Sequence, residues 1–202
     1  MTPANLDETG SVYTIGHSNH TMETFLNLLH GQQIEVLIDT RSSPFSRYAP
    51  QFNKDSLKQA VEAAGLRYGF YGRHLGGRPD DESLYDEDGR VVYSQVAKTF
   101  LFNDGLDRLI QGMETHRVAL LCSEENPSIC HRRLLVSRVL YEQGFAVHHI
   151  RGSGVVQSEA DLRREEEDER STQLGLFGEE VREWKSIQSV LPKARLSNSS
   201  AD

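Results

Sequence analysis

Val118-Ala119-Leu120-Leu121-Cys122 is a run of five apolar residues in the second half of the chain. An uninterrupted run of this length indicates a strand that is buried on both faces, as in a parallel sheet covered by helices. Asn126-Pro127 follows, and it predicts a helix start because Asn is a preferred N-cap and Pro a preferred first helical residue. We therefore expect a helix over residues 127–143, which ends before Gly144.

The same alternation of strand and helix continues on both sides of this stretch. Apolar runs predict strands over residues 12–15, 34–38, 66–71 and 145–150. Helical spacing predicts helices from about residue 21, over 55–64 and over about 94–113. The expected fold class is therefore α/β: a single-domain, open and mainly parallel sheet with helices on both faces, similar to a Rossmann fold.

Length and composition bound the domain organisation. A chain of 202 residues accommodates one well-buried domain and a tail. We expect a flexible N-terminus over residues 1–10, the α/β domain over 11–154, and a charged, largely flexible tail over 155–202.

The composition also indicates a compartment. No apolar run approaches the length of a membrane helix, and Met1–Gly10 lacks the basic start and apolar core of a signal peptide. We expect a cytoplasmic protein that does not contact membranes. In that compartment the two cysteines, Cys122 and Cys130, are expected to be catalytic, redox-active or metal-binding rather than joined in a structural disulfide.

The net charge of −8 argues against a nucleic-acid binder when it is taken alone. However, six acidic residues lie between Asp80 and Asp88. The rest of residues 11–154 carries a net positive charge, so a local basic face is compatible with the sequence.

Polar residues follow the expected strands at their carboxyl ends, which is where open parallel sheets bind ligands. Because these ends share one edge of a sheet, we expect a single site there. Its candidate residues are His17, Ser18, Asp39, Arg41, Gly76, Gly77, Cys122 and Glu124.

Cys130 is the candidate nucleophile or redox thiol. If it lies in the first turn of a helix, the helix dipole together with Arg132 and Arg133 favours the thiolate. His131 or His17 would then act as the general base. The alternative is a small buried residue that packs on the sheet; the same alternative applies more strongly to Cys122.

Three arginines, Arg41, Arg47 and Arg132, are candidates for binding a phosphate. Asp39 is a candidate catalytic acid, or else it forms an ion pair with Arg41 that fixes the end of a strand. Glu124 is a candidate general acid or base, or a partner of one of these arginines.

Two further patterns are open to a structural interpretation. Gly76-Gly77 permits a close backbone approach, or it only forms a turn. The aromatic and basic residues from Arg47 to Phe52, with Tyr68 and Tyr71, suit single-stranded nucleic acid, but core packing explains the aromatic residues equally well.

A metal site would use Cys122, Cys130 and His131, with His17 as a fourth ligand. The spacing is not that of a zinc finger, and neighbouring residues such as Cys130 and His131 point in different directions on a helix. We therefore expect no metal and no cofactor, with zinc as the alternative.

Several motifs together resemble the domain-of-unknown-function family 488, a bacterial and archaeal α/β family. They are Thr14-Ile15-Gly16-His17-Ser18, Asp39 through Arg47, Gln51-Phe52-Asn53, Gly65-Leu66-Arg67-Tyr68, Leu75-Gly76-Gly77, Cys122 through Glu124, Cys130-His131-Arg132 and His149-Ile150. The resemblance covers about residues 11–151, and the chain departs from the family pattern at Asn126, where Asp is usual. It implies the fold and the site, and no settled activity.

A second resemblance lies in the tail. The pentapeptide Gln173-Leu174-Gly175-Leu176-Phe177 is similar to the motif that binds the bacterial DNA polymerase sliding clamp. In that mode Leu174, Leu176 and Phe177 would fill an apolar groove and Gln173 would satisfy polar groups at its rim. The alternative is that these residues fold back onto the domain or form an amphipathic turn.

Together these features lead to one functional hypothesis and two alternatives. The hypothesis is a Cys-dependent hydrolase or transferase that acts on nucleic acid or a nucleotide-like substrate, in DNA repair or replication, and is recruited by the sliding clamp. One alternative is a non-catalytic module that binds a nucleotide or modified base. The other is a thiol-dependent enzyme of small-molecule metabolism.

Overall fold

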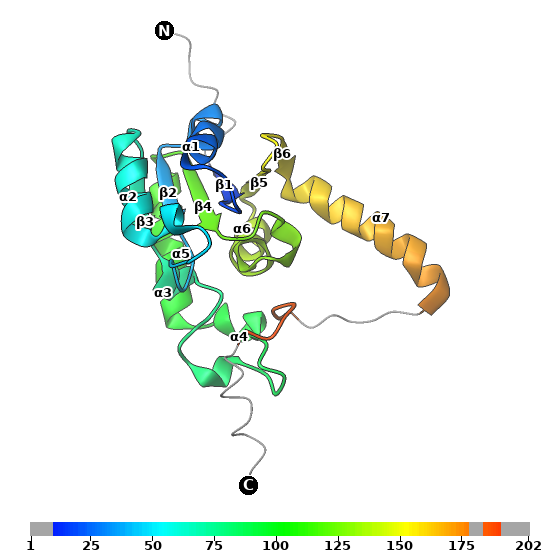
Figure 1. Ribbon diagram of the computed structural model, residues 1–202. Coiled ribbons are helices and arrows are strands. Elements are labelled where there is room, and N and C mark those ends of the chain that lie inside the picture. The colour runs from blue at the N-terminus through cyan, green and yellow to red at the C-terminus, as the bar shows by residue number, and fades with distance from the viewer. Residues whose placement is uncertain (1–9, 178–183, 191–202) are drawn as a thin grey trace.

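The computed structural model describes residues 10–177 and 184–190, with the side chains of 169–177 left out. Its centre is a six-stranded sheet of order β3-β2-β4-β1-β5-β6 (Figure 1). The first five strands are parallel and β6 is antiparallel to β5. Their bounds are β1 Ser11–Gly16, β2 Val36–Asp39, β3 Arg67–Phe70, β4 Val118–Cys122, β5 Ala146–Ile150 and β6 Val156–Ser158.

Helices connect these strands and cover both faces of the sheet (Figure 1). They are α1 Met22–Gly31, α2 Lys54–Ala63, α3 Gly72–Leu75, α4 Tyr93–Val96, α5 Phe100–Met113, α6 Arg138–Glu142 and α7 Glu159–Phe177. Short 3-10 turns lie at Pro50–Phe52, Glu82–Leu84 and Pro127–Ile129, and a π-helical segment at Arg132–Ser137 leads into α6. The expected α/β class with an open, mainly parallel sheet is confirmed.

Alternation along β4 divides the core into two layers. Leu120 packs in one cluster with residues of α5 and α6, whereas Leu121 packs in the other with residues of α1 and α2. Both side chains are completely buried. This is the pattern expected for a central strand with helices on both sides, because successive side chains point to opposite faces.

The expected helix over 94–113 is wrong in one respect, because it is two helices. α4 ends at Val96, and α5 begins at Phe100 after a new N-cap, where Thr99 Oγ1 accepts a hydrogen bond from the N–H of Phe102. Threonine favours such a cap because its side chain satisfies an N–H that the first turn leaves free.

The expected helix over 127–143 is also wrong at its start. Asn126 caps only a 3-10 turn, and Cys130 after it is extended, with φ −113° and ψ 139°. The Cys130 carbonyl accepts from the N–H groups of Arg133 and Leu134, so Cys130 is the N-cap of the helical segment that begins at His131. It does not lie in a first helical turn.

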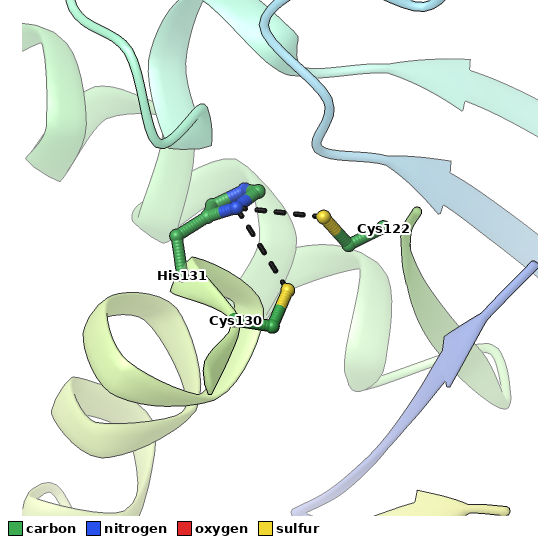
Figure 2. A group of neighbouring side chains, drawn as sticks. All are labelled: Cys122, Cys130 and His131. Atoms are coloured by element: carbon green, nitrogen blue, oxygen red, sulfur yellow. Dashed lines mark hydrogen bonds between the residues drawn. The ribbon is translucent and has the colours of Figure 1, made fainter. Parts of the chain in front are cut away.

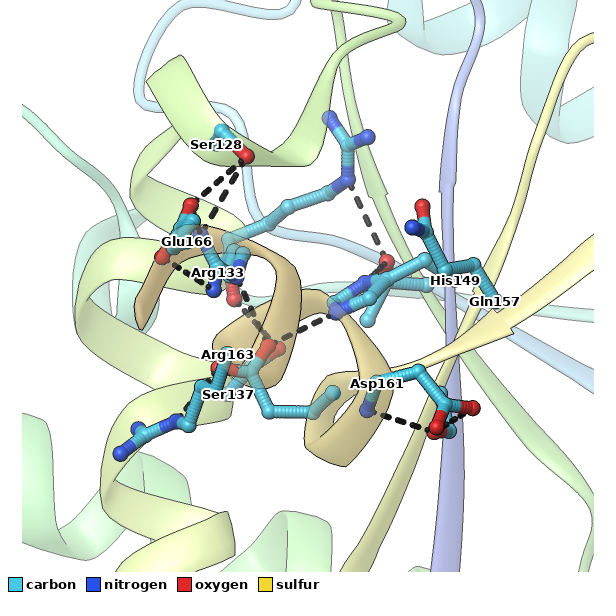
Figure 3. Close-up of polar contacts among 12 residues, drawn as sticks. Ser128, Arg133, Ser137, His149, Gln157, Asp161, Arg163 and Glu166 are labelled. Carbon is cyan, nitrogen blue, oxygen red and sulfur yellow. Dashed lines mark hydrogen bonds and ion pairs between the residues drawn. The ribbon is translucent and has the colours of Figure 1, made fainter. Parts of the chain in front are cut away.

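The folded part of the chain extends past residue 154. β6 pairs with β5, and α7 is held at its start by Arg133, whose guanidinium contacts Glu159 and Glu166 (Figure 3). Further on, Trp184 Nε1 donates to the Leu134 carbonyl at 2.6 Å. These contacts join residues far apart in the sequence, which local charge patterns do not reveal.

The helices in the described part of the chain were also compared with what a lipid bilayer requires. None combines the length and the apolar composition that crossing a membrane would need.

Candidate functional site

The sheet topology brings the carboxyl ends of three neighbouring strands together. β4 lies between β2 and β1, so the residues after Asp39, Cys122 and Gly16 share one edge. A pocket of about 440 Å³ lies there. Its lining includes Arg41, Ser42, Ser43, Phe45, Gly77, Arg78, Tyr93, Cys122, Glu124, Ile129, Cys130 and His131.

Two thiols and a carboxylate meet within this pocket. Glu124 Oε2 accepts hydrogen bonds from Cys122 Sγ at 2.8 Å and from Cys130 Sγ at 3.2 Å. Both cysteines are free and almost completely buried. Burial raises the pKa of the Cys130 thiol well above its ordinary value, which is opposite to the expected stabilisation of a thiolate by a helix terminus.

Glu124 is the ionised partner in this group. Burial alone would raise the pKa of its carboxyl, but hydrogen bonds from Cys122 and Cys130 and the nearby His131 lower it below its usual value. A carboxylate that touches two thiols is placed to accept a proton from either.

His131 joins the cluster through one ring nitrogen. Its Nδ1 lies 3.5 Å from Cys122 Sγ and 4.0 Å from Cys130 Sγ (Figure 2). Its Nε2 lies 3.1 Å from the Thr40 carbonyl oxygen. Because a carbonyl only accepts, Nε2 carries a hydrogen, and Nδ1 is the ring nitrogen that faces the two sulfur atoms. Burial alone would lower the pKa of His131, but Cys130, Glu124 and the Thr40 carbonyl raise it.

Gly77 packs directly on this imidazole ring. A Cβ at this position would lie 2.6 Å from His131 Cγ, closer than real side chains approach. The close approach predicted for Gly76-Gly77 therefore has a specific partner. It holds His131 against the thiols.

Asp39 and Arg41 form a buried ion pair rather than two free groups. The Arg41 guanidinium donates from Nε and Nη2 to the two carboxylate oxygens of Asp39, at 2.9 and 2.7 Å. Tyr68 Oη also donates to Asp39 at 2.7 Å. The structure thus places Asp39 in the ion-pair role at the strand end, with Arg41 still lining the pocket.

Arg132 does not face the pocket. Its side chain is completely buried, and its guanidinium donates to the main-chain carbonyls of Glu124 and Glu125. Gly16 packs against the same loop, since a Cβ there would lie 1.8 Å from the Glu124 carbonyl oxygen. Arg132 thus positions the loop that carries Glu124, and the phosphate contact predicted for it has no free donor facing the site.

Four other predicted site residues, Gly76, His17, Ser18 and Arg47, lie outside the pocket lining. Gly76 packs against the main chain of α3, since a Cβ there would lie 2.1 Å from the Gly72 carbonyl oxygen. His17 is buried and stacked on Phe52, with Nδ1 bonded to the Ser18 carbonyl and Nε2 without a hydrogen-bond partner among the described residues. Ser18 itself bonds Asn19. Arg47 is exposed on the loop that contributes Phe45.

Sequence reasoning missed several residues of the site. Thr40 orients His131 although it lies inside a quoted motif, and Arg78 and Tyr93 line the pocket without any motif of their own. The wall formed by residues 186–190 was also missed. It comes from the far end of the chain, so only the tertiary structure reveals it.

The comparison with protein families is consistent with this geometry. The model of the family described as Domain of unknown function DUF488 matches residues 21–139, which is more than half of the chain. The chain belongs to the DUF488 family. The DUF488 match includes Cys122, Glu124, Cys130 and His131, and it is shorter than the expected range of about 11–151. No curated protein and no solved structure matches the chain.

The tail pentapeptide lies outside the DUF488 match. The backbone of residues 173–177 forms the last turns of α7, and their side chains are not among those that the structure describes. Figure 1 shows α7 extending away from the sheet, so this end of the helix is remote from the pocket.

Proposed function

We propose that the protein is an enzyme that acts on nucleic acid or a nucleotide-like substrate in the pocket at the strand ends. Glu124 transfers the proton, and the reactive groups beside it are the thiols of Cys122 and Cys130 and the imidazole of His131. The observation that carries the proposal is the contact of one Glu124 oxygen with both Cys122 and Cys130 inside the pocket.

The pocket lining supports the substrate class. Arg78 provides positive charge beside the serines at 42 and 43, which suits an anionic group such as a phosphate, while Arg41 lines the same pocket paired with Asp39. Phe45 lines the same pocket while 68% of its surface is exposed, and Tyr48 on the same loop is completely exposed. Exposed aromatic rings next to arginines are typical of surfaces on which bases stack.

The test compares Glu124→Gln with the native protein on single-stranded DNA, RNA, mononucleotides and nucleosides. The amide keeps the shape of the side chain but does not take up a proton, so turnover should fall about 10²- to 10⁴-fold. Glu142→Gln, at an exposed helix position, is the matched control and should keep full activity. Binding without turnover in the native protein would refute the enzyme and favour a binding module.

We also propose that the pentapeptide from Gln173 to Phe177 recruits the protein to the bacterial sliding clamp. Its sequence pattern and its place at the far end of α7 support this. Docking of the peptide in an extended form requires the last turns of α7 to unwind. The end of a helix that packs few apolar side chains unwinds easily.

Recruitment is tested by binding of the purified protein to purified clamp. Leu176→Ala combined with Phe177→Ala should abolish binding, because these side chains would fill the apolar groove. Val155→Ala, an exposed apolar position outside the pentapeptide, is the control. Equal binding by the double variant would refute recruitment through this segment.

A further inference from the structure

We propose that Cys122, Cys130 and His131 bind one zinc ion through their Sγ, Sγ and Nδ1 atoms, with a fourth coordination position that opens to the pocket. The inference concerns the same pocket as the proposed enzyme function and assigns its metal. The geometry of the three ligands carries it, so it does not depend on which substrate the protein uses.

The three donor atoms already have the spacing of a metal site. They lie within 4.8 Å of one another, with Nδ1 3.5 Å and 4.0 Å from the two sulfur atoms. Zinc bonds to sulfur and nitrogen of about 2.3 and 2.0 Å in tetrahedral geometry place these atoms about 3.5 Å apart. Small side-chain movements are therefore enough to complete the site.

The imidazole is also prepared for a metal. The Thr40 carbonyl holds a hydrogen on Nε2, so Nδ1, which faces the two sulfur atoms, is the ring nitrogen left to bind a metal. Metal-binding histidines commonly donate their other ring N–H to a carbonyl in this way. Gly77 leaves room for the ring in this position, since a Cβ there would lie 2.6 Å from His131 Cγ.

The backbone at Cys130 resolves the objection that Cys130 and His131 are neighbours in the sequence. If both were in a regular helix, their side chains would diverge. Cys130 is extended and His131 is helical, so the two side chains converge toward Cys122 (Figure 2). The turn at Asn126-Pro127 that precedes Cys130 brings this about.

The chemistry of the donors selects the ion. Two thiolates and an imidazole are ligands that zinc prefers over the harder cations magnesium and calcium. Cys₂His with one open position is an arrangement that catalytic zinc sites use. All three ligands line the pocket, where a water molecule or a substrate oxygen would take the fourth position beside Glu124.

The test uses the full-length protein, reduced and freed of metal, and titrates it with cobalt(II) as a spectroscopic substitute for zinc. One equivalent should produce a thiolate-to-cobalt charge-transfer band and the intense visible bands of tetrahedral cobalt, and zinc should displace it. A reduced protein that gives no charge-transfer band would overturn the proposal.

Variants identify the ligands. Cys122→Ser, Cys130→Ser and His131→Gln should each reduce cobalt affinity at least 100-fold, while His30→Gln, at an exposed helix end, should leave it unchanged. Circular dichroism checks that each ligand variant is folded. Thr40→Val removes the hydroxyl 3.3 Å from His131 Nε2 but keeps the carbonyl that accepts from the ring, so it should leave cobalt affinity within a few-fold of the native value. Unchanged affinity in folded ligand variants would refute this ligand set.

Different experimental results would refute the metal site and the enzyme function. Glu124→Gln should keep cobalt binding and lose turnover. Cobalt binding without turnover of any substrate would leave the metal site standing and refute the function. Turnover by reduced, metal-free protein that does not bind cobalt would refute the metal site and leave the function standing.

Discussion

Arg133 Nε lies 2.8 Å from Glu159 Oε2, and both side chains are almost completely buried. Arg133 belongs to the π-helical segment that follows His131, whereas Glu159 begins α7. His149 Nε2 lies 2.9 Å from the same Glu159 oxygen, and its Nδ1 is bonded to Thr14 Oγ1. One carboxylate therefore joins α7, the central sheet and the helix beside the pocket.

Glu159→Gln should destabilise the protein by about 3 kcal/mol, because it removes the more deeply buried of the two carboxylates that pair with the Arg133 guanidinium. The free energy of unfolding is measured by urea denaturation at neutral pH. Glu142→Gln removes an exposed partner of Arg138 and should cost about 0.5 kcal/mol or less. If both variants lost the same free energy of unfolding, the buried ion pair would stabilise the protein no more than the exposed one.

The same network makes stability depend on pH. Burial alone would raise the pKa of Glu159, but hydrogen bonds from His149 and Arg133 lower it to about 2. In the unfolded chain the Glu159 carboxyl binds a proton near pH 4.5, whereas in the folded protein it stays ionised at that pH. The stability that Glu159 contributes is therefore present above pH 4.5 and is lost as the pH falls toward 2.

His149 acts in the same direction at higher pH. Burial lowers its pKa, so the unfolded chain takes up a proton below about pH 6.5 before the folded protein does. The free energy of unfolding should therefore decrease from pH 7 to pH 4, and more steeply below pH 4.5. Glu159→Gln should flatten the lower part of this curve. A native protein equally stable at pH 7 and pH 4 would contradict the prediction.

Gly77→Ala should damage the site more than the fold. The added Cβ would meet His131 Cγ at 2.6 Å, so the imidazole must move away from the thiols. We expect at least a tenfold loss of turnover and of cobalt affinity, with a change in unfolding free energy of about 1 to 3 kcal/mol. Gly112→Ala in α5 is the control, because a Cβ there meets nothing within 4 Å.

Residues 184–190 should protect the thiols. Ser186, Ile187 and Val190 line the pocket, and Trp184 holds this segment through the Leu134 carbonyl and a stacked Arg138. A chain that ends at Phe177 should react several-fold faster with a thiol reagent when it is metal-free. A chain that ends at Val190 keeps the wall and should react as the full-length protein does.

Local rules predicted much of the fold. Val118 to Cys122 is the central strand, Thr21 caps α1 through the N–H of Thr24, and Gly65 after α2 has a φ of +83°. Each of these features depends on residues adjacent in the sequence. The split at Thr99 was missed because the apolar spacing continues across it.

The sequence predicted where the site lies better than it predicted what each of its residues does. The strand-end rule placed Asp39, Cys122 and Glu124 at one edge; Cys122 and Glu124 line the pocket there, and Asp39 ends the neighbouring strand β2. Whether an arginine binds ligand or carbonyl oxygen depends on the loop that surrounds it, and Arg132 is enclosed by the loop at Glu124. The convergence of Cys130 and His131 depends on one extended residue that no periodicity encodes.

α7 also has a consequence for reach. Its 19 residues extend about 28 Å at 1.5 Å per residue, and its first residue, Glu159, is tied to the sheet through His149. With residues 173–177 extended on a partner, the helix left over 159–172 would be a spacer of about 21 Å, and each residue inserted into it would rotate the partner by about 100° around the axis. The length of the helix and the direction in which its end points would then decide, together with the pentapeptide, how the pocket approaches a nucleic-acid strand that passes through the partner.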